Sequence, residues 1–126
     1  MPKKILLADD DPNILKLVKL RLEANGYEVV TASDGEECMA KVFSEKPQLI
    51  LLDLMMPKVD GYAVLVGLKE MHGLQEGIPD IPVVVLTAMG DSRVKDLVQK
   101  EHIADYVLKP FNSQDLLAKV KKALGE

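Results

Sequence analysis

Polar side chains that could do chemistry follow short apolar runs at four places in the chain. Asp9 and Asp10 follow one run, Asp53 follows another, and Thr87 and Lys109 stand at the ends of two later runs. A carboxylate among apolar neighbours loses solvation, so Asp53 is expected there only if it has a charged or hydrogen-bonding partner or a functional role. Two carboxylates about 4 Å apart repel by roughly 4 kcal/mol at an effective dielectric constant of about 20. A divalent cation would relieve that repulsion, and an all-oxygen site with few carboxylates suits Mg²⁺.

These residue types together indicate phosphoryl chemistry. A carboxylate beside Mg²⁺ can act as a nucleophile toward phosphorus and form an aspartyl phosphate. A lysine and a hydroxyl donor, such as Lys109 and Thr87, stabilise the charge that develops on the phosphoryl oxygens.

Each residue also has a structural explanation. Asp53 could be a helix cap or a paired acid, and Asp9 and Asp10 could form a solvated acidic edge. Thr87 could be an ordinary strand residue, and Lys109 a surface lysine with a buried stem.

The elements that must position these residues alternate along the chain. Runs that are apolar throughout predict strands at 5–8, 28–31, 48–52, 83–86 and 106–108. Stretches with helical periodicity predict helices at 12–25, 34–44, 60–71, 92–100 and 112–124. Uniformly apolar strands are typical of parallel sheets covered on both faces. We therefore expect an α/β fold: a flavodoxin-like, doubly wound parallel sheet of five strands in the order 2-1-3-4-5, with five helices on both faces.

This topology would bring the polar residues together. In doubly wound sheets, ligands bind beyond the carboxyl ends of the strands, at the point where the strand order reverses. Asp9 and Asp10 end the first strand and Asp53 ends the third, and these two strands flank that point in the expected order. Thr87 and Lys109 end the fourth and fifth strands at the same edge. Their joint placement favours a functional site over the separate structural explanations.

Helix ends are marked by capping residues. Asp11 before Pro12 is an expected N-cap, and Asn25-Gly26 is an expected helix end. Ser33 and Glu36 have the spacing of a capping box. The N-caps of the last two helices are expected at Asp91 and Asn112. On the second face of the first helix, Leu17 and Leu20 would be either an interface or part of a broadly buried helix.

Composition excludes several functional classes. The chain has 126 residues, 48% of them hydrophobic and 29% charged, which fits a single globular domain spanning residues 1–126. A formal net charge of −4 leaves no basic footprint for direct binding of nucleic acid or of an anionic membrane. The lone Cys38 and the lack of a signal peptide or membrane span favour a cytoplasmic location. The segment Asp9 to Asn13 has no glycine to cradle a nucleotide phosphate.

Four segments, in order and correctly spaced, resemble the receiver domain of bacterial two-component response regulators, including the chemotaxis-regulator type. They are Ile5 to Asp10, Leu49 to Pro57 with Asp60-Gly61 behind it, Thr87-Ala88, and Tyr106 to Phe111. The resemblance runs from about Lys3 to Leu124, essentially the whole chain. It implies a phosphorylation-activated signalling switch of a two-component phosphorelay, which catalyses only its own phosphoryl transfer and dephosphorylation and is not otherwise an enzyme.

The resemblance also implies a role for each site residue. Asp53 would accept a phosphoryl group from a phosphohistidine on a sensor histidine kinase or phosphotransfer protein. Asp10, Asp53 and the backbone carbonyl of Met55 would hold Mg²⁺, with Asp9 acting through water. Lys109 would pair with the phosphoryl oxygens, and its bond to Pro110 looks like the family's cis peptide. Thr87 would donate its hydroxyl to the phosphoryl group, and Tyr106 would turn inward as Thr87 moves. A downstream protein would then bind residues 91–124.

Two departures and two alternatives accompany this interpretation. His102 stands where the family commonly has glycine, which puts the turn there in question. Met55 and Met89, two residues beyond Asp53 and Thr87, would flank the phosphoryl group and keep water away, giving a long-lived phosphorylated state. One alternative is a receiver-like binding module that is not phosphorylated. The other is a haloacid-dehalogenase-like phosphatase, which needs a second acid where this chain has Met55.

Overall fold

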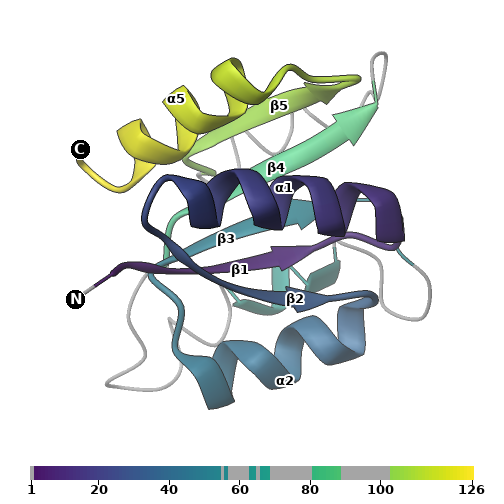
Figure 1. The fold of residues 1–126 in the computed structure, drawn as a ribbon. Coiled ribbons are helices and arrows are strands. Elements are labelled where there is room, and N and C mark those ends of the chain that lie inside the picture. Colours follow the sequence, from purple (N-terminus) through teal and green to yellow (C-terminus); the bar gives the residue numbers. More distant parts are fainter. Residues whose placement is uncertain (1, 55, 57–62, 65, 69–80, 89–102) are drawn as a thin grey trace.

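A computed structural model describes residues 2–54, 56, 63–64, 66–68, 81–88 and 103–126 (Figure 1). The strands are β1 (Lys4–Ala8), β2 (Glu28–Ala32), β3 (Leu49–Asp53), β4 (Val83–Ala88) and β5 (Asp105–Lys109). The helices are α1 (Pro12–Ala24), α2 (Gly35–Glu45) and α5 (Ser113–Ala123). Residues 63–64 and 66–68 are helical within the expected helix 60–71, and the expected helix 92–100 lies outside the described residues.

The five strands form one parallel sheet in the order β2-β1-β3-β4-β5, which confirms the expected topology. Figure 1 shows α1 and α5 on one face of the sheet and α2 on the other. The register aligns Ala8 of β1 with Leu52 of β3, so the residues that follow them, Asp9 and Asp53, lie side by side at the carboxyl edge. Among the strands that the structure describes, β5 is the last of the sheet and pairs with β4.

The core has two layers because every central strand is buried on both faces. Alternate residues of β1 illustrate this: Ile5 and Leu7 pack toward α1 and α5, whereas Leu6 and Ala8 pack toward α2. All five residues of β3 are buried, and the last of them is Asp53. A strand that is apolar on both faces therefore leads directly into a carboxylate, which is the pattern that the sequence showed.

Most helix ends follow the expected chemistry. The side chain of Asp11 accepts a hydrogen bond from the Asn13 backbone N–H and begins α1, and Asn112 caps α5 in the same way through the Asp115 N–H. The expected Ser33–Glu36 capping box is wrong by one residue. Asp34 is the N-cap of α2, and the Glu37 carboxylate reaches back to the Ser33 N–H. Aspartate competes with serine as an N-cap, and the spacing alone did not choose between them.

One non-glycine residue at a helix end has a left-handed backbone. Lys46, the C-cap of α2, has φ of 50° and ψ of 60°. Helices often end in this conformation, and glycine adopts it without the clash that a Cβ atom makes with the backbone. The Lys46 position therefore carries a local backbone cost.

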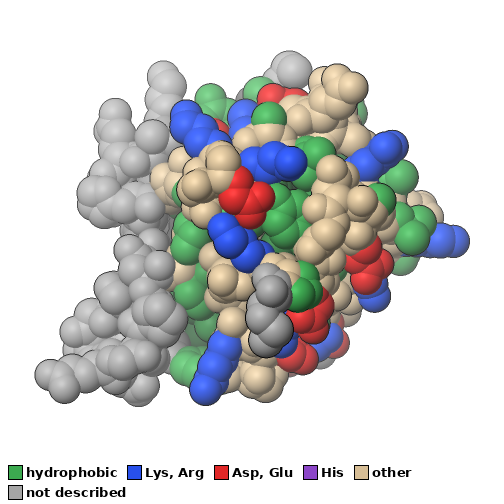
Figure 2. All heavy atoms as spheres, turned by 60° about the vertical axis from the view of Figure 1, so that its left-hand side comes forward, with side chains coloured by type: hydrophobic (Ala, Val, Ile, Leu, Met, Phe, Trp, Pro, Cys, Tyr) green, Lys and Arg blue, Asp and Glu red, His purple; other side chains and the backbone are tan. Residues whose placement is uncertain are grey.

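The amino ends of the strands form a surface of mixed charge. The Tyr27 hydroxyl donates a 2.7 Å hydrogen bond to Glu126 Oε1, and Lys3 Nζ lies 3.2 Å from Glu126 Oε2. Burial and the hydrogen bond to Glu126 raise the pKa of Tyr27 to about 12. Figure 2, which turns this side of the molecule forward, shows acidic and basic side chains interspersed, with no broad area of one sign on the described part of this face. Among the described residues, no helix has the length and apolar character needed to cross a membrane.

Candidate functional site

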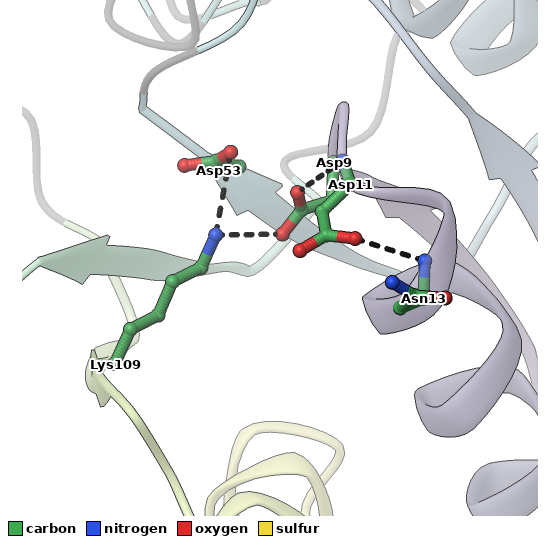
Figure 3. A network of polar contacts seen from close by, with 5 residues as sticks. All are labelled: Asp9, Asp11, Asn13, Asp53 and Lys109. Atoms are coloured by element: carbon green, nitrogen blue, oxygen red, sulfur yellow. Dashed lines mark hydrogen bonds and ion pairs between the residues drawn. The ribbon is translucent and has the colours of Figure 1, made fainter.

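Three charged side chains from three different strands meet at the carboxyl edge of the sheet. Asp9 follows β1, Asp53 ends β3 and Lys109 ends β5. Figure 3 shows the Lys109 side chain extending between the two carboxylates. Its Nζ lies 2.9 Å from Asp9 Oδ2 and 3.4 Å from Asp53 Oδ2. The edge at which the sequence placed these residues is thus a single site.

The site is strongly acidic and largely withdrawn from water. Carboxylate oxygens of Asp9, Asp10 and Asp53 all lie within 4.8 Å of one another. Asp9 is fully buried and Asp53 is 3% exposed, whereas Asp10 faces solvent. Three carboxylates against one ammonium leave an excess of two negative charges at the site. Such a cluster attracts cations, and an all-oxygen donor set with one water-facing side suits Mg²⁺, which keeps some of its waters when bound.

Lys109 holds the two buried carboxylates together. The ammonium hydrogen-bonds Asp9 Oδ2, and the other Asp9 oxygen accepts a 2.9 Å hydrogen bond from the backbone N–H of Asp11. Partial burial on its own would lower the pKa of Lys109. The hydrogen bond to Asp9 and the charge of Asp53 outweigh burial, so the pKa lies above its ordinary value. Lys109 is therefore a cation at neutral pH.

The peptide bond between Lys109 and Pro110 is cis. A groove of about 370 Å³ begins beside this bond and runs along α1. Its lining residues are Ile14, Leu17, Val18, Lys109, Pro110 and Phe111. Leu17 is 57% exposed and Leu20 is 59% exposed. The second face of α1 is therefore exposed, and the alternative of a broadly buried first helix is wrong.

Thr87 and Tyr106 lie on adjacent strands. Thr87 is fully buried in β4, and the register pairs it with Leu108, while Tyr106 pairs with Val85. Side chains two residues apart in a strand share a face, so Val85 and Thr87 point to the same side of the sheet. Tyr106 packs against the core cluster on that same side, which includes Val85. Tyr106 is therefore the diagonal neighbour of Thr87.

One contact of Tyr106 was missed by the sequence analysis. Lys119 of α5 donates a 2.7 Å hydrogen bond to the backbone carbonyl of Tyr106, and its Nζ lies 5.3 Å from the centre of the ring. Asp115 and Lys119 are four residues apart on α5 and form an ion pair at 3.8 Å, a spacing that concerns the helix surface alone. Contact with β5 depends on how α5 packs on the sheet, which no local pattern encodes.

Several expectations fall outside the described residues. These are the Met55 carbonyl as a metal ligand, the flanking roles of Met55 and Met89, the turn at His102, the N-cap at Asp91, and the part of the expected partner surface between residues 91 and 102. The described part of that expected surface consists of β5 and α5. The acidic cluster, Lys109 and Thr87 all lie within the described residues.

Comparison with known proteins adds independent findings. A family model described as the response regulator receiver domain matches residues 5–121. The chain is 41% identical over 124 residues to the alkaline phosphatase synthesis transcriptional regulatory protein PhoP of Bacillus subtilis (strain 168), covering 98% of this chain and 49% of that protein. It is 43% identical over 126 residues to the DNA-binding dual master transcriptional regulator RpaA of Synechocystis sp. (strain ATCC 27184 / PCC 6803 / Kazusa), covering 98% and 49%.

A solved structure is similar over nearly the whole chain. The response regulator receiver domain protein (CheY-like) from Methanospirillum hungatei JF-1 superposes with a TM-score of 0.85 at 32% identity, covering 99% of this chain and 95% of that one. The chain spans about half the length of the curated relatives it matches. The likeness to those relatives is therefore a likeness to part of each of them.

Proposed function

This chain belongs to the response regulator receiver domain family of two-component systems, and from that premise we propose that it is a signalling switch turned on by phosphorylation of Asp53. The observation that carries the proposal is the position of the Asp53 carboxylate. It is almost fully buried at the end of β3, close to two more carboxylates and 3.4 Å from the Lys109 ammonium. A buried carboxylate beside other carboxylates and an ammonium group is suited to attack phosphorus.

The proposed reaction transfers a phosphoryl group from a phosphohistidine of a sensor histidine kinase or phosphotransfer protein. One Asp53 oxygen forms a bond to phosphorus while the bond from phosphorus to the imidazole nitrogen breaks. The nitrogen keeps the bonding electron pair, so the products are an aspartyl phosphate and a histidine. Lys109, already 3.4 Å from Asp53, would pair with the phosphoryl oxygens, and the Thr87 hydroxyl would donate to one of them.

Asp10 and Asp53 would hold Mg²⁺ in this site, with Asp9 acting through water. The donor set fits, because all three residues supply oxygen and their oxygens lie within 4.8 Å of one another. When bound, Mg²⁺ would neutralise negative charge on the phosphoryl group. The chain would transform no external substrate and would catalyse only its own phosphorylation and dephosphorylation.

The switch would reach a partner through β5 and α5. An aspartyl phosphate carries about −1.5 to −2 charge units in place of the single negative charge of the carboxylate, and it brings three strong acceptor oxygens to the site, by analogy with other phosphorylated side chains. If the Thr87 hydroxyl moves toward those oxygens, it leaves space next to its diagonal neighbour Tyr106, which would turn into it. The surface of residues 91–124 would change, and a downstream protein that prefers the new surface would shift the population toward it.

Incubation with acetyl phosphate and Mg²⁺, followed by intact-mass measurement, tests this proposal. We expect the wild-type chain to gain the mass of one phosphoryl group, only when Mg²⁺ is present. An Asp53→Asn variant should gain nothing, whereas Asp11→Asn, which keeps a capping side chain outside the acidic cluster, should react like the wild type. A folded wild-type chain that gains no mass would refute phosphorylation and leave a receiver-like binding module. Continuous release of inorganic phosphate from a phosphomonoester would instead indicate a phosphatase.

A further inference from the structure

We propose that Lys119 is a positioning residue that holds Tyr106 in the conformation of the unphosphorylated chain and thereby opposes activation. This inference rests on the proposed function, because it assigns a control element to the same switch. It concerns an interaction between α5 and the free edge of β5. The interaction involves both the backbone and the ring of Tyr106.

The backbone of Tyr106 faces away from the rest of the sheet. Its carbonyl accepts a 2.7 Å hydrogen bond from Lys119 Nζ, and its N–H donates a 2.8 Å hydrogen bond to Asp105 Oδ1. In a parallel sheet, the N–H and C=O of one residue point to the same neighbouring strand, and among the described residues no strand lies on this side of β5. The side chains of Asp105 and Lys119 thus replace the missing strand at this one residue.

The same ammonium also acts on the ring. Lys119 Nζ lies 5.3 Å from the centre of the Tyr106 ring, within the range of a cation–π interaction. The Lys119 side chain is 28% exposed, and its charge is shared with Asp105 Oδ1 at 4.0 Å and Asp115 Oδ2 at 3.8 Å. These two carboxylates place negative charge beside the ammonium, and the same ammonium contacts both the ring and the carbonyl of Tyr106.

The position of Tyr106 gives this contact a consequence for the switch. Tyr106 is the diagonal neighbour of the buried Thr87 and packs on the same side of the sheet. A ring that moves when Thr87 moves must leave the place in which Lys119 holds it. Lys119 would therefore stabilise the conformation of the unphosphorylated chain. Its loss would shift the equilibrium toward the conformation of the phosphorylated chain, by a factor set by the strength of the cation–π contact with the ring. For a partly exposed cation–π pair, that strength corresponds to roughly two- to fivefold.

Fluorine NMR of protein labelled with 3-fluorotyrosine can follow the ring directly. The chain has three tyrosines, Tyr27, Tyr62 and Tyr106, so single tyrosine-to-phenylalanine variants assign the three signals. Lys119→Met removes the charge and keeps most of the apolar stem. Lys119→Arg is the rescue variant, since a guanidinium can both donate to the carbonyl and stack on the ring. Lys122→Met, at an exposed position of the same helix, is the matched control.

Two readouts are compared, the Tyr106 signal without ligand and its response to beryllofluoride with saturating Mg²⁺. Beryllofluoride mimics a phosphoryl group on a carboxylate without a covalent step. We expect Lys119→Met to move the free Tyr106 signal toward its beryllofluoride-bound position and to lower the half-saturating concentration roughly two- to fivefold. Lys119→Arg and Lys122→Met should both match the wild type.

The outcomes separate this inference from the proposed function. If the wild type responds to beryllofluoride, Asp53→Asn does not, and Lys119→Met has an unchanged midpoint, the switch exists and Lys119 does not control it. A Tyr106 signal unmoved by Lys119→Met, or a midpoint raised by it, overturns the inference in the same way. If the wild type does not respond at all, the proposed function fails and the role of Lys119 fails with it.

Discussion

Replacing Asp10 by asparagine should stabilise the protein without Mg²⁺ and remove part of the stabilisation that Mg²⁺ provides. Asp10 contributes to the acidic cluster, where its carboxylate oxygen lies within 4.8 Å of oxygens from Asp9 and Asp53. Folding brings Asp53 close to Asp10, whereas Asp9 is the sequence neighbour of Asp10 and lies near it in the unfolded chain as well. Asp10 is exposed, so its removal creates no cavity and leaves no buried group without a partner.

The magnitude follows from the separation. Two unit charges 4.8 Å apart repel by about 3.5 kcal/mol at an effective dielectric constant of 20 and by about 0.9 kcal/mol in water. Because Asp10 faces solvent, its repulsion from Asp53 should lie near the lower value, and its repulsion from Asp9 is partly present in the unfolded chain. Attraction to Lys109 offsets part of the sum, so we expect a net stabilisation of about 0.5–1 kcal/mol for Asp10→Asn. Mg²⁺ at about 100 times its dissociation constant would stabilise the wild type by about 2.7 kcal/mol, enough to cancel or reverse this difference.

Urea unfolding followed by circular dichroism, with and without Mg²⁺, measures both effects. Asp11→Asn is the matched control, because asparagine caps a helix as well as aspartate does and Asp11 is not part of the cluster. Its stability should change by less than about 0.5 kcal/mol. The reasoning fails if Asp10→Asn is no more stable than the wild type without Mg²⁺, or if Mg²⁺ stabilises both proteins equally.

Three further predictions test other parts of the structure. Lys46→Gly should raise the free energy of unfolding by about 1 kcal/mol in urea titrations, because glycine adopts the left-handed conformation without strain, and Lys46→Ala should give no such gain. Absorbance titration should find one phenol with a pKa of about 12, assigned to Tyr27 by its loss in Tyr27→Phe. The native state then holds this proton more tightly than the unfolded chain, whose ordinary pKa is 10.0, so the Tyr27 contribution to stability should be complete below pH 10 and vanish as the pH rises through 12. Burial raises the pKa of the Cys38 thiol to about 12, so a thiol reagent at pH 8 should modify it only as fast as the structure opens, and a rapid native-state reaction would contradict its burial.

Much of the fold could be predicted because the parallel sheet leaves a strong pattern in the sequence. Strands buried on both faces are continuous apolar runs, and β3 from Leu49 to Leu52 is the clearest example. The carboxylate that ends this strand was identifiable because burial of an unpaired charge is costly. Once the strand order is known, the juxtaposition of Asp9, Asp53 and Lys109 follows from the register.

What the sequence could not show depends on geometry between elements or on single backbone angles. The hydrogen bond from Lys109 to Asp9, shorter than its distance to Asp53, depends on side-chain conformations within the site. The contact of Lys119 with Tyr106 depends on the packing of α5 on the edge strand. The left-handed backbone of Lys46 was not foreseen, since lysine is not a residue that this conformation favours.

Chemical identification of the phosphorylated residue tests the central claim most directly. After reaction with acetyl phosphate and Mg²⁺, borohydride reduces an aspartyl phosphate to homoserine and releases the phosphate, which marks the residue permanently. Peptide mass spectrometry should find homoserine at position 53 in the wild type and nowhere in Asp53→Asn. Homoserine at position 9 or 10, or no conversion in a chain shown to be folded, would contradict the assignment of Asp53 as the phosphoryl acceptor.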